Sequence, residues 1–193
     1  MRILVLYAHP DPESYVAALH RKAVDALARS GHEVDDCDLY AEGFDPVLSR
    51  EERRSYLDVP ANRRSVESYV RRIEAADGLV LVFPVWNFGF PAILKGFLDR
   101  VFLPGVSFTL VNGLAMPNLT QLKVLVAIAT YGAPRWRAFI IGDPPRKVVM
   151  RMLRVLVAPA ARRRYLALHD MNRQTPDGRA AFLERVEKTL SAI

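Results

Sequence analysis

The chain contains little cysteine and little histidine. Cys37 is its one cysteine, which excludes an internal disulfide and a cysteine-rich metal site. The four histidines lie far apart, at positions 9, 20, 32 and 169, and no pair has the His-x-x-x-His spacing that binds zinc. We therefore expect no metal centre.

Long hydrophobic runs are also missing. Purely apolar runs, such as 79–85, are far shorter than the roughly 20 residues that span a bilayer. The apolar stretch at 3–8 is at the lower limit for a signal-peptide core, and no small-residue cleavage site follows it. We interpret this stretch as a buried first strand, and we expect a cytoplasmic protein that does not insert into membranes.

Glycine-rich phosphate loops are absent too. After the first apolar run, residues 8–16 read AHPDPESYV. This segment has neither the Gly-x-Gly-x-x-Gly of a Rossmann dinucleotide site nor the Gly-x-x-x-x-Gly-Lys-Ser/Thr of a P-loop. A receiver domain would carry an acidic pair directly after its first strand, whereas Asp35, Asp36 and Asp38 fall inside the second predicted strand.

What is present is an ordinary globular composition with an uneven charge. Apolar residues make up 51% and charged residues 25% of 193 residues, values typical of one domain, which we place at 1–193. The net charge of +6 is concentrated between 144 and 169, where seven basic residues meet no acid. Such a stretch can bind nucleic acid, acidic lipid or a phosphorylated ligand, or it can be a solvated helix face. The stretch lacks the repeated aromatic interleaving used for base stacking, so we expect no nucleic-acid partner. Peripheral docking through Arg146–Arg164 stays open.

Strand patterns alternate with helical patterns along the chain. Five strands are predicted, at residues 2–8, 33–39, 78–83, 123–130 and 164–169. Helices are predicted at 14–30, 63–76, 91–102, 144–157 and 175–191. Between them, 41–61 is a long connection with a capping box at 49–52, and 104–121 is a loop. This alternation predicts a parallel sheet with helices on both faces.

Five strands that alternate with helices in this way fit an α/β three-layer sandwich of the flavodoxin-like type. The expected sheet is parallel and five-stranded, with the order 2-1-3-4-5. Ligands of such folds bind beyond the carboxyl ends of the strands, at the switch point between strands 1 and 3. The candidate binding loops are therefore 8–15, 84–91 and 130–137, which we call loops one, two and three.

Loop one enters the N-terminus of a helix, where unpaired N–H groups and the helix dipole attract a phosphate. Ser14 can add a hydroxyl, and the backbone amides of Tyr15 and Val16 follow it. His9 can donate to a phosphate oxygen. The alternative interpretation makes Ser14 a plain N-cap and His9 a turn residue.

Loop two gathers aromatic rings at a strand end. Its members are Pro84, Val85, Trp86, Asn87, Phe88, Gly89 and Phe90. Large exposed rings are costly unless they cover something flat, and a planar heteroaromatic ligand meets that need. Backbone N–H groups of 86–88 can then approach its polar edge. The alternative is that the rings pack under a loop or in a dimer interface.

Loop three begins with a hydroxyl residue, a ring and a glycine, which are Thr130, Tyr131 and Gly132. Their backbone amides can meet the other end of the same flat ligand. The alternative is a plain Gly/Pro turn. Three loops of complementary chemistry on one sheet edge favour a ligand more strongly than any one of them.

In order along residues 1–132, the chain carries motifs that resemble those of the NAD(P)H:quinone oxidoreductase (DT-diaphorase-like) family. They are YAHP at 7–10 with Ser14, DLY at 38–40, FDP at 44–46, AAD at 75–77, FPVW at 83–86, PAILKG at 91–96 and DRVF at 99–102. The resemblance implies a flavodoxin-like fold, a tightly bound FMN or FAD, and a homodimer with its site at the subunit interface. It also implies a two-step, two-electron reaction. NAD(P)H gives a hydride to flavin N5, and a quinone or related small-molecule acceptor then takes it in the vacated pocket.

The resemblance also implies roles for individual residues. The flavin phosphate end would be held by His9, Ser14, Tyr15 and Val16. The flavin ring would be held by Pro84, Val85, Trp86, Asn87 and Phe88, and on its other edge by Thr130, Tyr131 and Gly132. The catalytic pocket for nicotinamide and acceptor would be shaped by Trp86, Phe88 and Tyr131.

Two departures from the family's pattern leave parts of this reading open. The family's Thr-Thr-Gly-Gly motif is replaced by TYGA at 130–133. The family's Tyr and His charge relay has no clear counterpart, because residues 135–169 offer only Tyr165 and His169. The acceptor, the proton donor and the choice between FMN and FAD stay open. So does the choice between NADH and NADPH, where Arg135 or Arg137 would favour a 2′-phosphate.

Two other functions remain as alternatives. One is a flavodoxin-type one-electron carrier, although the basic isoelectric point of about 9.7 and the His-Pro loop argue against it. The other is a regulatory flavoprotein subunit of a potassium efflux system, which would dock through the basic stretch.

Overall fold

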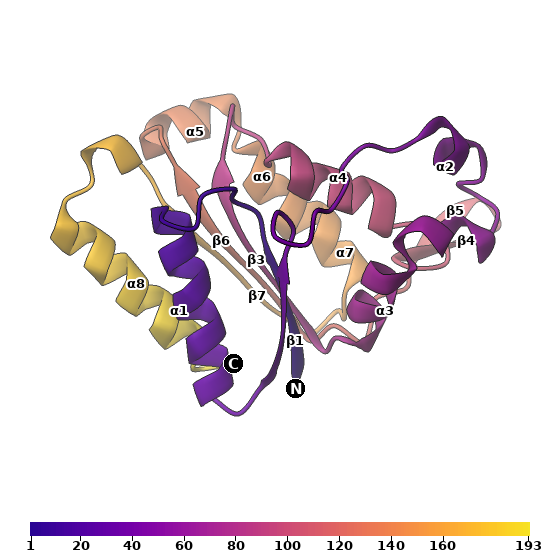
Figure 1. Ribbon diagram of the computed structural model, residues 1–193, viewed down its shortest axis with the longest axis horizontal. Helices are drawn as coiled ribbons and strands as arrows, with labels where there is room; N and C mark the ends of the chain where they lie inside the picture. Colours follow the sequence, from indigo (N-terminus) through magenta and orange to yellow (C-terminus); the bar gives the residue numbers. More distant parts are fainter.

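The computed structural model describes residues 1–193 and is built around one parallel sheet (Figure 1). The five strands of this sheet are β1 (Arg2–Tyr7), β2 (Glu33–Asp38), β3 (Gly78–Val85), β6 (Val124–Tyr131) and β7 (Arg162–Leu168). They lie in the order β2-β1-β3-β6-β7, and every neighbouring pair is parallel. The predicted flavodoxin-like fold and its strand order are confirmed.

Burial explains which strands lie in the middle. β3 and β6 are buried along their whole length because helices cover both of their faces. The more polar β2 forms one edge of the sheet, as its sequence predicts. β7 forms the other edge and begins with three arginines at 162–164.

Helices cover the sheet in two layers. On one face lie α1 (Tyr15–Arg29) and α8 (Pro176–Leu190), drawn in indigo and yellow in Figure 1. On the other lie α3 (Glu67–Ala75), α4 (Ala92–Val101) and the helical segments between 135 and 156. Successive side chains of β1 alternate between the two cores. No helix combines the length and the apolar character needed to cross a membrane.

Shorter elements complete the structure. They are α2 (Arg50–Arg54), η1 (Ala61–Val66), α5 (Arg135–Ile141), α6 (Pro144–Lys147), η2 (Val148–Leu153), α7 (Arg154–Leu156) and η3 (Met171–Arg173), together with the strands β4 (Phe108–Val111) and β5 (Leu114–Pro117). The predicted capping box is confirmed: Ser49 accepts from the Glu52 N–H, and the Glu52 carboxylate accepts from the Ser49 N–H.

The prediction of an unstructured loop at 104–121 is wrong. β4 and β5 form an antiparallel hairpin there, joined by Asn112 and Gly113 at φ values of 52° and 78°. Positive φ at both central residues is the type I′ turn that suits a two-residue hairpin. The strands carry exposed apolar side chains on both faces, so they show no alternation of the kind that predicts a half-buried strand.

The helical predictions also need correction. Residues 135–141 form α5, where a loop was expected. The single helix expected at 144–157 is divided into α6, the π-helical segment η2 and α7. The helix expected at 63–76 begins as the 3₁₀ segment η1 before α3. The tighter and wider turns have their own periods, so the 3.6-residue pattern does not detect them.

One glycine is required for the packing next to the site. Gly96 lies on α4 where this helix crosses the connection that contains Pro46. A Cβ atom at position 96 would collide with the Pro46 backbone, including its carbonyl oxygen. Glycine therefore allows α4 to pack directly on this connection.

Candidate functional site

The three candidate loops meet at one edge of the sheet. Loops one, two and three follow β1, β3 and β6, which are adjacent and parallel, so their carboxyl ends share that edge. The rings of His9 in loop one and Trp86 in loop two lie 5.7 Å apart between centroids, tilted by 59°. The sheet thus brings together the loops that the sequence singled out.

Loop one presents hydrogen-bond donors at the start of α1. The Ser14 side chain caps the helix by accepting the Ala17 N–H at 3.1 Å, so Ser14 is the N-cap of α1. Capping uses the oxygen as an acceptor and leaves the hydroxyl hydrogen free to be donated. The N–H groups of Tyr15 and Val16 have no acceptor within the chain. The start of this 15-residue helix is therefore able to receive an anion.

His9 is oriented by its own loop. The Asp11 N–H donates to His9 Nδ1 at 3.0 Å. The Asp11 carbonyl oxygen lies 3.2 Å from the same nitrogen, so loop one holds Nδ1 and leaves Nε2 without a partner in the chain. In the tautomer in which Nδ1 accepts, Nε2 carries the proton. Nε2 is then a donor beside loop two, consistent with the phosphate-binding role that the sequence predicts for His9.

Tyr7 is a polar residue at this edge that sequence reasoning missed. Its side chain is 3% exposed and stacks on His20 at 4.2 Å between ring centroids. Its phenol oxygen is buried and has no hydrogen-bond partner. Burial raises the pKa of Tyr7, and the neighbouring Ser14 hydroxyl partly offsets the rise. The detectable signal was a tyrosine at the end of a buried strand, directly before the phosphate-type loop.

Loop two is a tight turn in an uncommon conformation. The N–H of Trp86 and of Gly89 each donate to the carbonyl of the other, at 3.2 and 2.8 Å. Asn87 and Phe88 between them have φ values of 48° and 57°. This is a type I′ turn, and a bulky residue such as Phe88 adopts positive φ only at a cost of about 1–3 kcal/mol. The N–H groups of Asn87 and Phe88 have no acceptor within the chain.

The rings of loop two divide between core and surface. Phe90 packs edge-on against Phe83 of β3 at 5.0 Å between centroids, and half-buried Phe88 also packs on the core. These two rings follow the alternative interpretation, packing beneath the loop. Trp86 is 41% exposed and stands beside His9. Pro84 and Val85 belong to β3 and are buried.

Loop three places its backbone and its side chain in different surroundings. Thr130 and Tyr131 end β6, and Gly132 follows with open space where a Cβ would project. The Tyr131 ring is 1% exposed and points into the protein. Its hydroxyl donates to Asp143 Oδ1 at 2.6 Å and accepts from the Tyr165 hydroxyl at 2.6 Å. The Tyr131 ring therefore lies behind loop three. The predicted role in shaping the catalytic pocket would need the ring on the open edge of the sheet.

The buried surroundings of Tyr131 and Tyr165 keep both phenols protonated. Burial is the main cause that raises the pKa of both Tyr131 and Tyr165. The His169 ring lies 4.3 Å from the Tyr131 ring, and burial lowers its pKa. Its Nδ1 is buried without a hydrogen-bond partner. Both phenols remain donors at neutral pH, and the imidazole is neutral.

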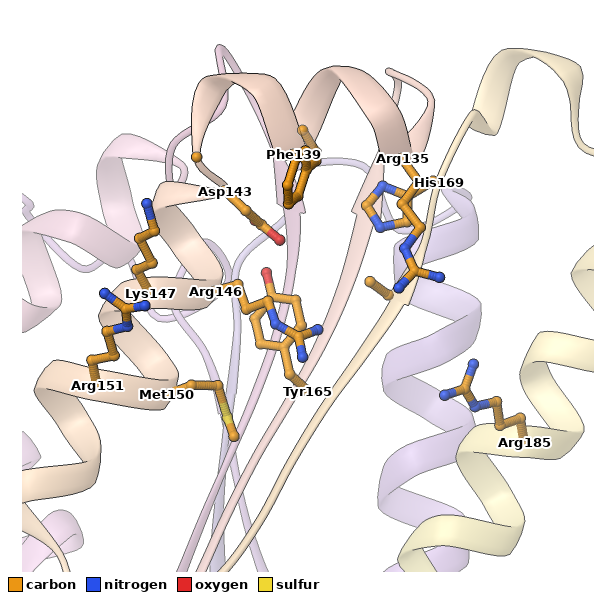
Figure 2. Close-up of a pocket in the computed structure, with 13 residues that line it drawn as sticks. Arg135, Phe139, Asp143, Arg146, Lys147, Met150, Arg151, Tyr165, His169 and Arg185 are labelled. Carbon is orange, nitrogen blue, oxygen red and sulfur yellow. The ribbon is translucent and has the colours of Figure 1, made fainter.

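A cavity of about 500 Å³ opens beside this cluster, on the β7 side of loop three (Figure 2). Asp143, Tyr165 and His169 contribute to its wall. Five basic side chains surround it, namely Arg135, Arg146, Lys147, Arg151 and Arg185. The basic stretch of the sequence is therefore not a single surface: its first part lines this cavity, whereas the arginines at 162–164 begin the edge strand.

The residues present fit a flavin. A phosphate tail needs N–H donors at a helix start, and a flat ring with polar atoms along one edge needs backbone N–H groups held in a rigid turn. The free N–H groups of Tyr15 and Val16 beside the unpartnered Tyr7 phenol provide the first. The free N–H groups of loop two and the open space at Gly132 provide the second. No group of three or more His, Cys, Asp and Glu side chains is placed to hold a metal ion.

Comparison with known proteins agrees with this fold. The profile of a family described as having a flavodoxin-like fold matches residues 1–190. NAD(P)H dehydrogenase (quinone) 1 of Rattus norvegicus is 32% identical to the chain, in an alignment that covers 100% of the chain and 77% of the rat protein. The chain spans 54% of the Cavia porcellus protein of the same name.

Solved structures are similar over the whole chain. The crystal structure of Smu.1420 from Streptococcus mutans has a TM-score of 0.87 and 30% identity, with 100% of both chains covered. An FMN-dependent NADH-azoreductase from Bacillus anthracis, solved in complex with FMN, has a TM-score of 0.80 at 16% identity, with 99% of this chain and 98% of that chain covered. At that identity the likeness concerns the fold alone.

Proposed function

The chain belongs to the family with the flavodoxin-like fold that includes the NAD(P)H quinone dehydrogenases, and from this premise we propose that it is a flavin-dependent NAD(P)H oxidoreductase. It transfers a hydride from NAD(P)H, by way of a bound flavin, to a quinone or a related acceptor. The support is the sequence relationship to the rat quinone dehydrogenase together with the geometry of the three loops.

One observation carries this proposal. Unpaired N–H groups stand at the start of α1 and in the turn of loop two, on neighbouring strands of one sheet edge. The buried phenol of Tyr7, at the end of β1, has no hydrogen bond within the chain that meets normal geometry. A buried donor without a good partner, such as the Tyr7 phenol, costs free energy. Together with the free N–H groups at the same sheet edge, it favours a ligand that accepts these hydrogen bonds.

The bound flavin supplies the chemistry, because its ring accepts a hydride and passes it on. The chain's own residues bind and orient it. Tyr15, Val16, Ser14 and His9 Nε2 hold the phosphate end as donors. The rigid turn at 86–89 presents the N–H groups of Asn87 and Phe88 to the ring's polar edge. Trp86 stands over the open side, where it shapes the space for nicotinamide and acceptor.

A second copy of the chain completes the site. α5 follows loop three and exposes three large apolar side chains that do not line the cavity, those of Trp136, Ile140 and Ile141. A contiguous apolar surface of this kind is typical of a protein interface. A homodimer that covers α5 would enclose the open side of the flavin edge and exclude water from it.

Steady-state kinetics with the purified chain test this function. The chain loaded with FMN or FAD is mixed with NADH or NADPH and a soluble quinone, without any partner protein. The expected result is continuous NAD(P)H oxidation that depends on the quinone. A flavin-loaded chain that oxidises neither nucleotide contradicts the proposal and favours a carrier or a regulatory subunit.

A further inference from the structure

The cavity beside loop three is lined by cations that have no counter-ions. None of Arg135, Arg146, Lys147, Arg151 and Arg185 forms an ion pair. Other exposed basic side chains of the chain are unpaired too, but these five are set apart because they gather around one cavity. Five unpaired cations around one cavity strongly favour an anion within it.

The cavity wall contains little negative charge to balance these cations. Asp143 is the one acidic residue in the cavity wall, and its carboxylate already accepts the Tyr131 hydroxyl. Figure 2 shows the basic side chains coming from different elements, with Lys147 and Arg151 on one side of Tyr165 and Arg185 of α8 on the other. The buried Nδ1 of His169 adds a further unpartnered polar atom at this cavity. The wall therefore offers several separate contacts to negative groups.

The same wall has apolar parts. Phe139 is 83% exposed and projects at the top of the cavity in Figure 2, and Met150 lies lower in the wall. A flat ring stacked on Phe139 with phosphates among the cations would use both kinds of surface. A volume of about 500 Å³ is within the range of pockets that hold small organic ligands. The combination is that of a nucleotide site.

The cavity is joined to the flavin edge through loop three. Tyr131 ends β6 beside Gly132, while its hydroxyl reaches Asp143 in the cavity wall. Arg135 begins α5, three residues after Gly132. A long ligand whose reactive end lies at loops two and three can therefore place its other end among these cations.

We propose that this cavity binds the phosphorylated adenosine end of the nicotinamide donor and recognises its 2′-phosphate, which makes NADPH the preferred donor. The inference rests on the proposed function for the identity of the ligand. NADPH carries one phosphate more than NADH, and the cavity cations form no ion pair within the chain, although Arg146 lies over the Tyr165 ring at 5.5 Å from its centroid. Arginine suits this role because its planar fork matches phosphate geometry.

Equilibrium binding tests the inference without turnover. Calorimetry on the flavin-loaded protein compares 2′,5′-ADP with 5′-AMP and with inorganic pyrophosphate. We expect 2′,5′-ADP to bind at least about tenfold more tightly than 5′-AMP. The reason is that 5′-AMP has no 2′-phosphate and so lacks the charge-assisted hydrogen bonds that this group would form. Equal binding of both nucleotides, binding of neither, or pyrophosphate binding as tightly as 2′,5′-ADP overturns the proposal.

A matched pair of variants locates the site. Lys147→Gln/Arg151→Gln removes two cavity cations, and Arg154→Gln/Arg164→Gln removes two exposed cations that do not line the cavity. The first variant should lose at least about tenfold in 2′,5′-ADP affinity and raise KM for NADPH but not for NADH. The second should leave both unchanged. If both variants change 2′,5′-ADP affinity and KM for NADPH to the same extent, the 2′-phosphate is not recognised in the cavity and the inference is refuted.

Failure of this inference is separable from failure of the proposed function. An enzyme that oxidises NADH and NADPH with equal KM refutes the 2′-phosphate site and leaves the function standing. An inactive, flavin-free protein refutes the function, and the same calorimetric comparison made on that flavin-free protein still decides whether the cavity binds 2′,5′-ADP.

Discussion

Tyr7 carries the most specific expectation at the scale of single residues. Its buried phenol lacks a partner in the chain and lies beneath the loop that we assign to the flavin phosphate. Apart from its contact with the Ser14 hydroxyl, this phenol makes no hydrogen bond within the chain, and it can donate to a phosphate oxygen once the ligand is bound. Ligand affinity and protein stability should therefore respond differently to its removal.

We predict that Tyr7→Phe weakens flavin binding by about tenfold, because one hydrogen bond to a charged group is lost. The free energy of unfolding of the flavin-free protein should not fall. Fluorescence titration with FMN and FAD and urea denaturation measure the two quantities.

Tyr15→Phe is the matched control for this pair of measurements. The Tyr15 hydroxyl donates to the Arg179 carbonyl of α8 at 2.7 Å. Its loss should reduce stability by about 1 kcal/mol and leave flavin affinity largely intact, because the backbone amide remains. If Tyr7→Phe lowers stability and not affinity, its phenol has a structural role and the assignment to the phosphate site is wrong.

Residue positions were predictable where a motif carried them. Ser14 and His9 lie where the sequence placed them, because a strand followed by a capped helix has local rules. The inward turn of Tyr131 was not predictable. It depends on Asp143 and Tyr165, which are 12 and 34 residues away. Tyr165 contacts Tyr131 because β6 and β7 are paired, and Asp143 reaches it from the turn after α5.

At the scale of elements, α2 is tied to α4 by a buried ion pair. Glu52 accepts from Arg100 Nη2 at 2.5 Å and from the Ser65 hydroxyl at 2.6 Å. The two charged side chains are 15% and 10% exposed. Burial alone would raise the pKa of Glu52, but the hydrogen bonds from Ser65, Arg100 and Ser49 outweigh it and lower this pKa to about 2.

This pair should make stability depend on pH in the acidic range. The folded pKa of Glu52 is below its ordinary value of 4.5, so the pair's contribution is complete above about pH 4.5 and is lost as the pH falls through about 2. We predict that the free energy of unfolding declines more steeply over this range in the wild type than in Glu52→Gln. Urea denaturation at several pH values measures this free energy.

Glu51→Gln, at an exposed neighbour, is the control and should behave as the wild type does. Equal slopes of the free energy of unfolding against pH in all three proteins would refute the assignment.

Elements were predictable where burial imposes a period. β1, β3 and β6 were found because buried parallel strands are continuous apolar runs. α5 was missed because its pattern is not that of an amphipathic helix. Ala138 is its one buried residue, and its exposed side is largely apolar, so it lacks the polar face that marks a surface helix. The β4–β5 hairpin was missed although Asn112-Gly113 is a strong turn signal, because no alternation flanks it.

At the scale of the whole molecule, exposed α5 predicts association. We expect the wild type to be a dimer by size-exclusion chromatography with light scattering, and Ile140→Glu to be a monomer with reduced quinone-dependent NAD(P)H oxidation. A buried unpaired charge is costly, so one glutamate should disrupt the interface.

Val155→Glu is the control for this substitution. Val155 is also an exposed apolar residue, but it lies on α7. It should leave the dimer intact. A monomeric wild type, or dissociation by both variants alike, would contradict the assignment of α5 to the interface.

The placement of the site was predictable for a topological reason. In a parallel sheet the loops after adjacent strands must share an edge, so three sequence segments could be assembled without coordinates. The basic cavity could not be found in this way. Its lining comes from α5, α6, η2, β7 and α8, which have no common motif and meet only when the edge strand is in place.

The identity of the group that co-purifies with the chain tests the central claim most directly. The visible absorption spectrum is recorded, and the mass of the compound released by denaturation is determined, before and after incubation with FMN and FAD. The account predicts a yellow protein that holds FMN or FAD in equimolar amount. A colourless protein that takes up neither flavin would contradict it.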